Sequence, residues 1–138
     1  MHLDMNLMLC YDTHKFIGEL MFALLRRLRR MTRQQMLDSY RKLVIAKQDA
    51  AHMMSADDHD AMFSQTLQAK AKSTLTAMNA PMRALLEEIN DPRTFMIIQR
   101  YYVKGLTDQA IGREMNLTGA RVNQIRLEYV RSLTNQAS

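Results

Sequence analysis

Two neighbouring amides near the C-terminus, Asn123 and Gln124, have side chains suited to reading the edges of DNA bases. They follow Thr118, Gly119 and Ala120 closely enough for all five residues to lie on the first two turns of one helix. Asn and Gln can hydrogen-bond adenine bidentately in the major groove, and Ala and the Thr methyl group can contact the thymine methyl. We therefore interpret these five residues as candidate base-reading positions.

Basic residues surround this candidate surface. Arg121 and Arg126 flank the two amides in the sequence, and Lys104 and Arg113 precede them. Lys and Arg contacts to phosphates position a protein on DNA without reading its sequence. We expect Lys104, Arg113, Arg121 and Arg126 to contact phosphates. The plainer interpretation is a helical hairpin whose polar residues are merely solvated.

A second basic cluster lies near the N-terminus and consists of Arg26, Arg27, Arg29, Arg30 and Arg33. Positions 26, 30 and 33 fall along one face of a helix. Such a face can bind phosphates, or it can be the solvated side opposite a leucine stripe, and the sequence leaves both interpretations open. We treat the cluster as a possible secondary basic patch.

The sequence favours a protein without catalytic, metal or cofactor chemistry. Metal-capable side chains occur at His52, Asp57, Asp58, His59 and Asp60. Their spacing matches no zinc or calcium loop, and capping of a helix explains the acids. No nucleophile elbow or phosphate-binding glycine loop is present. We expect no enzyme activity, no catalytic residue, no metal and no cofactor.

The composition favours an all-α protein. The 138 residues include four Gly and two Pro, and 47% are hydrophobic, so turns are few and the elements are long. A single cysteine, Cys10, excludes a disulfide scaffold and suits a reducing compartment. The longest apolar stretch falls short of the roughly 20 residues of a membrane span. We expect a cytoplasmic protein with no membrane partner, and the net charge of +5 is compatible with a polyanionic one.

Apolar spacing and capping residues predict the order of the helices. We expect helices over residues 13–30, from Thr32 to Met54, and from Ser55 to Met78, then a break at residues 79–81 and a short helix to Ile89. Asp91 can cap a further helix, and Pro92 suits its first position. We therefore divide the chain into a helical assembly or partner region, 1–90, and a helix-turn-helix DNA-binding domain, 91–138.

The spacing of residues 107–133 predicts a helix-turn-helix. Thr107 and Thr118 can cap its two helices, and Asn116 suits a left-handed turn between them. Gly112 provides a small residue where the second helix approaches closely, and Leu117 fills the corner. Seven further positions are expected to face inward: Ile111, Met115, Val122, Ile125, Tyr129, Val130 and Leu133.

The stretch QRYYVKGLTDQAIGREMNLTGARVNQIRLEYVRSL, residues 99–133, resembles region 4 of the bacterial sigma-70 factors. The shared features are the Gly-Leu-Thr lead-in, the Asn-Leu-Thr turn, and the Arg-Val-x-Gln-Ile run from Arg121. The resemblance implies binding to the promoter −35 element, with base contacts at Gly119, Ala120, Asn123 and Gln124. Only Gln124 keeps a typical family residue. The short helical N-terminal part makes the layout similar to phage late-gene transcription regulators of the ArpU and RinA type.

The sequence therefore predicts an all-α, sequence-specific DNA-binding transcription regulator of phage or prophage type. Its partner would be double-stranded DNA, and we expect a homodimer because one such module reads few base pairs. Two alternatives stay open. Gly119 and Ala120 lack long side chains, which would also suit a module that binds RNA polymerase or a sigma-like partner. The N-terminal arginines would suit an architectural or DNA-packaging subunit.

Overall fold

A computed structural model of the chain describes residues 19, 22–23, 26–27, 30–54 and 61–136, and all regular structure within them is helical. The expected all-α class is thus confirmed. The elements are α2 (Arg33–Met54), α3 (Ala61–Glu87), α4 (Pro92–Ile98), the π-helix η1 (Gln99–Val103), α5 (Asp108–Met115) and α6 (Gly119–Gln136). Among the described helices, none has the length and apolar character needed to cross a membrane.

The chain forms two compact units, Met1–Met31 and Thr32–Ser138. The division expected after residue 90 falls inside the second unit, where α2 contacts both η1 and α6. In the first unit the described residues 19, 22–23, 26–27 and 30 are helical. There the guanidinium of Arg26 lies 4.5 Å from the ring centroid of Phe22.

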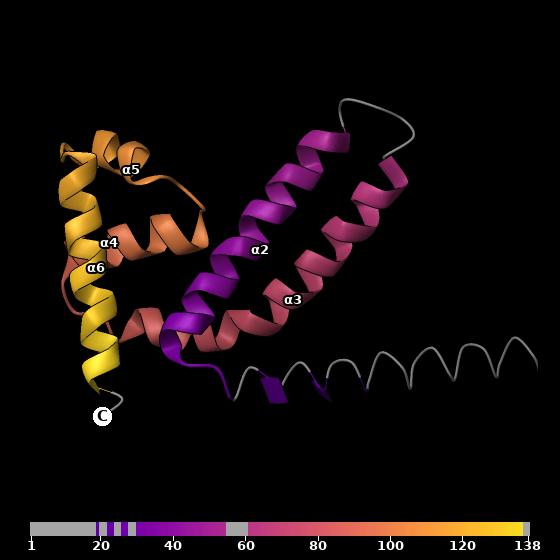
Figure 1. Ribbon diagram of the computed structural model, residues 1–138, viewed down its shortest axis with the longest axis horizontal. Helices are drawn as coiled ribbons and strands as arrows, with labels where there is room; N and C mark the ends of the chain where they lie inside the picture. Colours follow the sequence, from indigo (N-terminus) through magenta and orange to yellow (C-terminus); the bar gives the residue numbers. More distant parts are fainter. Residues whose placement is uncertain (1–18, 20–21, 24–25, 28–29, 55–60, 137–138) are drawn as a thin grey trace, which may run out of the picture. The chain divides into compact units, whose positions relative to one another are not determined.

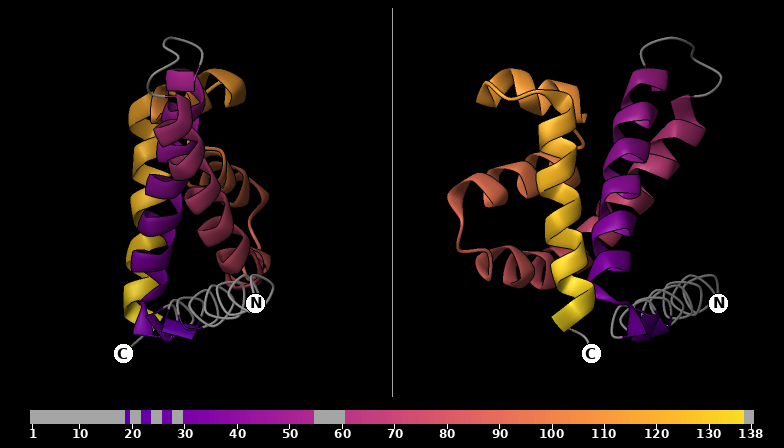
Figure 2. Two further views of the ribbon diagram at one scale, coloured as in Figure 1. Left: turned by 90° about the vertical axis from the view of Figure 1, so that its right-hand side faces the viewer. Right: turned by 60° about the vertical axis from the view of Figure 1, so that its left-hand side comes forward.

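Helix α2 begins where the sequence predicts. The backbone N–H of Gln35 donates to Thr32 Oγ1 at 3.1 Å, and the Thr32 N–H donates to Gln35 Oε1 at 3.0 Å. This reciprocal pair is a capping box, which satisfies two backbone N–H groups at a helix start. Helix α2 then pairs with α3 as an antiparallel hairpin, shown in Figures 1 and 2.

The break expected at residues 79–81 is wrong, because α3 continues through Pro81 to Glu87. An internal proline costs a helix about 3 kcal/mol, through a lost hydrogen bond and a clash with the preceding turn. Met78, Met82 and Leu85, only 1%, 2% and 4% exposed, lie on one helical face. Each such burial contributes roughly 1.5–3 kcal/mol, so together they outweigh the proline. Figure 1 shows the last turns of α3 running in a different direction from its first turns.

The start of α4 is also as expected. Asp91 accepts hydrogen bonds from the backbone N–H of Thr94 at 3.1 Å and from the Thr94 hydroxyl at 2.7 Å, and Pro92 is the first helical residue. These bonds hold the pKa of the Asp91 carboxyl below its usual value. Helices α4, α5 and α6 enclose a small apolar core made of Ile97, Ile111, Val122 and Ile125.

Candidate nucleic-acid interface

The connection between α5 and α6 has the local geometry that the sequence predicts. Thr107 Oγ1 accepts from the Ala110 backbone N–H at 3.2 Å, and Thr118 Oγ1 accepts from that of Arg121 at 3.1 Å, so both threonines cap their helices. Asn116 ends α5 in the left-handed conformation, with φ 57° and ψ 41°. Because both helices are capped and the turn between them is short and fixed, α6 has one orientation relative to α5.

Gly112 makes this turn possible. A Cβ atom at this position would lie 2.4 Å from the carbonyl oxygen of Leu117, a distance that real Cβ atoms do not reach. The Leu117 N–H also donates to the Gly112 carbonyl at 2.9 Å. The close approach expected at Gly112 is therefore present. The atoms that approach Gly112 belong to the backbone of the turn and not to the body of α6.

The start of α6 carries an exposed surface. Thr118, Ala120 and Gln124 are exposed, and Leu127, one turn further, is 38% exposed. Gly119 is half-buried, and its α-carbon faces Gln109 of α5. We call Thr118, Ala120, Arg121, Asn123 and Gln124 the α6 surface. Of the five predicted base-reading residues, four belong to it, and Gly119 contributes backbone only.

Arg126 is not the open phosphate contact that we expected from the sequence. Its side chain is only 12% exposed, and its Nε and Nη2 atoms donate to the two carboxylate oxygens of Asp108 at 3.3 and 3.1 Å. Nη2 also donates to Asn123 Oδ1 at 2.8 Å. Burial lowers the pKa of Arg126, but hydrogen bonds to Asp108 and Tyr102 raise this pKa by more than burial lowers it. The net shift is therefore upward. Arg126 therefore joins α6 to the start of α5.

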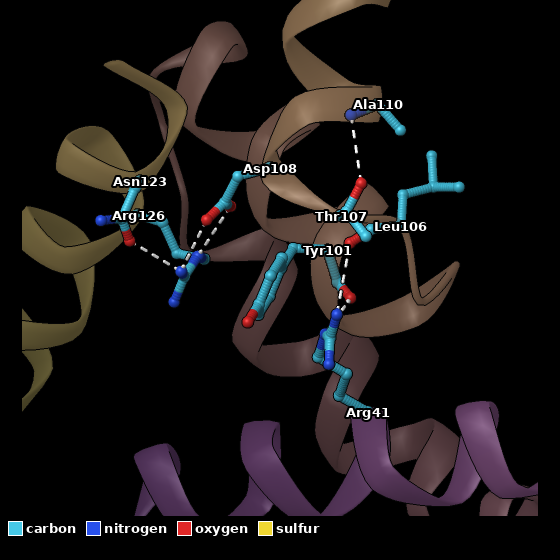
Figure 3. A network of polar contacts seen from close by, with 8 residues as sticks. All are labelled: Arg41, Tyr101, Leu106, Thr107, Asp108, Ala110, Asn123 and Arg126. Atoms are coloured by element: carbon cyan, nitrogen blue, oxygen red, sulfur yellow. Dashed lines mark hydrogen bonds and ion pairs between the residues drawn. The ribbon is translucent and has the colours of Figure 1, made fainter. Parts of the chain in front are cut away.

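Tyr101 of η1 continues this network toward α2. The Arg126 guanidinium lies 3.9 Å from the centroid of the Tyr101 ring, and the Arg41 guanidinium lies 4.0 Å from it. Arg41 also donates from Nε to the Tyr101 carbonyl at 3.1 Å and from Nη2 to the Leu106 carbonyl at 3.5 Å. Figure 3 shows the two arginines on either side of the tyrosine. Both are cation–π contacts, which gain strength where water is excluded.

Sequence reasoning missed Arg41, Tyr101 and Asp108 as members of this network. Arg41 and Tyr101 are 60 residues apart, and Arg126 and Asp108 are 18 apart. The one signal in the sequence was Asp108, directly after the capping residue Thr107. Because the helix dipole also favours an acidic residue in a first turn, this position does not by itself predict an ion pair.

The other predicted phosphate contacts occupy different environments. Lys104 and Arg113 are exposed, whereas Arg121 is half-buried and donates from Nη1 to Gln124 Oε1 at 2.9 Å. The backbone carbonyl of Lys104 accepts from Gln48 Nε2 at 3.2 Å, so its side chain extends from a fixed position.

The N-terminal arginine cluster is not one continuous helical face. Arg26, Arg27 and Arg30 are helical and exposed, but residues 31 and 32 are not helical. Arg33 belongs to α2, and its Nη1 donates to Glu88 Oε2 at 2.7 Å. Arg29 lies outside the described residues, as do Cys10 and the candidate metal-binding positions Asp57, Asp58, His59 and Asp60.

Comparison with protein-family models, with curated proteins and with solved structures gives no match for this chain.

Proposed function

We propose that the protein is a sequence-specific, double-stranded DNA-binding transcription regulator in which α6 enters the major groove as a recognition helix. The observation that carries the proposal is the α5–turn–α6 arrangement, with a fixed left-handed turn and an exposed α6 surface. A recognition helix contacts base edges with its N-terminal residues while the helix before it crosses the backbone. Thr118, Ala120 and Gln124 are exposed at that end of α6.

The charge of this region supports the same proposal. The first turn of α6 has no acidic residue, and its first acid in the sequence is Glu128. Lys104 and Arg113 are exposed basic residues from the elements that precede α6. Because phosphate contacts supply most non-specific affinity for DNA, we assign these two residues to backbone contacts, with Arg121 nearer the base edges.

The proposal extends to the class of regulator and to its assembly. The residues that resemble sigma-70 region 4, 99–133, coincide with η1, α5 and nearly all of α6. A phage late-gene type of regulator that recruits RNA polymerase is consistent with that resemblance. A homodimer would double the number of base pairs read, and the α2–α3 hairpin would be available for such an assembly.

The test introduces a carboxylate at the centre of the α6 surface. Ala120→Glu should lower affinity for a selected duplex at least tenfold, because the new charge would face phosphates and base edges. Ala46→Glu makes the same change at an exposed position of α2 and serves as the matched control. Binding is measured by fluorescence anisotropy with duplexes enriched from a random pool, at two salt concentrations, after circular dichroism has shown unchanged helicity.

Equal binding by Ala120→Glu and the wild type would contradict the proposed recognition helix. Salt-sensitive binding without an enriched motif would favour the architectural alternative. Failure of the wild type to bind any duplex would favour a protein partner such as RNA polymerase.

A further inference from the structure

The two amides of the α6 surface are oriented by arginines. Gln124 Oε1 accepts from Arg121 Nη1 at 2.9 Å, and Asn123 Oδ1 accepts from Arg126 Nη2 at 2.8 Å. A guanidinium has only N–H donors, so the oxygen of each amide must face its arginine. The NH₂ group of each amide is therefore the part left for a ligand.

The other polar groups of the α6 surface are donors as well. Thr118 Oγ1 accepts the capping hydrogen bond from the Arg121 backbone N–H, which leaves its hydroxyl proton available to donate. The Arg121 guanidinium has five N–H groups, and the bond to Gln124 uses only Nη1. With no carboxylate in α6 before Glu128, hydrogen-bond donors dominate this surface.

Bases differ in how well they match such a surface. In the major groove guanine presents two acceptors, N7 and O6, and thymine presents O4, whereas adenine presents one acceptor, N7, beside an exocyclic amine donor, and cytosine presents an amine donor. Bidentate reading of adenine by an amide requires the amide oxygen to accept from N6. If adenine N6 donated a second bond to Gln124 Oε1, its amine would lie beside the Arg121 guanidinium. Both groups are hydrogen-bond donors, so their N–H groups would repel each other.

We propose that α6 selects guanine and disfavours adenine at the base that Gln124 contacts, which we call the central position. Arg121 sets this specificity by occupying the Gln124 oxygen. This inference rests on the proposed function, and it replaces our sequence-based expectation that Asn123 and Gln124 read adenine. It makes Arg121, which the sequence predicts to contact a phosphate, a specificity-determining residue.

The experiment compares the motifs enriched from a random duplex pool by the full chain and by three variants. Wild-type protein should prefer guanine over adenine at the central position by about tenfold, within the range of one bidentate contact. Arg121→Ala removes the donor that holds Gln124 Oε1, so this preference should fall at least threefold as adenine gains. Gln124→Ala removes the oxygen that Arg121 occupies, so it should lower the preference for guanine over adenine as Arg121→Ala does. Arg131→Ala, an exposed arginine later on α6, is the charge-matched control and should keep the wild-type motif.

The outcomes separate this inference from the proposed function. An enriched wild-type motif centred on adenine, or a guanine preference that Arg121→Ala leaves intact, overturns the role of Arg121 while DNA binding stands. A wild-type chain that enriches no motif overturns sequence-specific binding and the inference together. Transfer of preference from guanine toward adenine in Arg121→Ala, with the Arg131→Ala motif unchanged, supports both.

Discussion

The guanidinium of Arg126 lies over the ring of Tyr101, 3.9 Å from its centroid, in a molecule where Arg41 approaches the same ring to 4.0 Å. Tyr101 belongs to η1, Arg126 to α6 and Arg41 to α2. One tyrosine therefore contacts both the proposed recognition helix and the α2–α3 hairpin. The carboxylate of Asp108 balances one of the two charges and ties the start of α5 to the same place.

Removing Arg126 should destabilise the fold. Arg126→Ala would leave the Asp108 carboxylate, 24% exposed, without its ion pair, and would remove one cation from the Tyr101 ring. The expected loss in free energy of unfolding is about 2–3 kcal/mol. Urea denaturation measures this loss directly.

Two further variants make the role of Arg126 specific. Arg126→Lys keeps the charge but loses the two-pronged bond to Asp108, so it should recover less than half of the lost stability. Arg113→Ala removes an exposed arginine and should stay within about 0.5 kcal/mol of the wild type. A fully stable Arg126→Ala protein would show that this network does not hold the helices together.

The turn before α6 should be intolerant of a side chain at Gly112. Gly112→Ala would place Cβ 2.4 Å from the Leu117 carbonyl oxygen, and because that atom is backbone the turn itself must move. We expect a loss of about 2–4 kcal/mol in the free energy of unfolding. Thermal unfolding followed by circular dichroism checks it.

Gly119→Ala is the matched control, seven residues later in the same motif. There the new Cβ would meet Gln109 Cγ at 3.2 Å, and a flexible side chain can move away. Alanine also loses less backbone freedom than glycine when a helix forms, a gain of about 0.5–1 kcal/mol. The control should therefore be neutral or slightly stabilising. Equal losses in the two variants would refute a special role for the Gly112 contact.

Features set by near neighbours in the sequence could be predicted, and features set by distant ones could not. The caps at Asp91, Thr107 and Thr118 each involve a residue three positions away, and all three are found as expected. Arg126 was misread because its partner Asp108 and the Tyr101 ring reach it only after folding. Helical spacing gives the face on which a residue lies, but the neighbouring helix decides whether that face meets solvent.

The continuity of α3 illustrates the same limit. The residues 79–81 carry a strong local signal for a break, since proline disfavours a helix interior. The opposing contribution comes from burial of Met78 and Met82, which depends on the position of α2. Local propensity therefore gave the wrong answer where tertiary packing supplied the larger free energy.

Tyr129 should ionise unusually late. Burial and then the nearby Glu88 charge raise the pKa of its phenol to about 12, against a usual value of 10. The folded state thus favours the protonated phenol, so its contribution to stability is complete below pH 10 and is lost as pH rises toward 12. Tyrosinate absorbance should show one late step that is missing in Tyr129→Phe.

The same variant provides the stability check. Between pH 10 and 12 the wild type should lose stability faster than Tyr129→Phe, whose side chain cannot ionise. Because burial also raises the pKa values of Tyr40 and Tyr102, the comparison between the two proteins isolates Tyr129. If the step missing in Tyr129→Phe lies near pH 10 instead of pH 12, Tyr129 reaches solvent more freely than its position implies.

The proposed phosphate contacts make a prediction about salt. If Lys104 and Arg113 each neutralise one phosphate, the plot of log affinity against log salt should become shallower by about 0.9 for each residue replaced by alanine. Affinity should fall by a similar factor for every duplex, because phosphate contacts do not read bases. Lys72→Ala, an exposed lysine on α3, removes the same charge elsewhere and should keep the wild-type slope. An equal change of slope in all three variants would indicate a diffuse charge effect. Loss of motif preference in Lys104→Ala or Arg113→Ala would instead place that residue at a base edge.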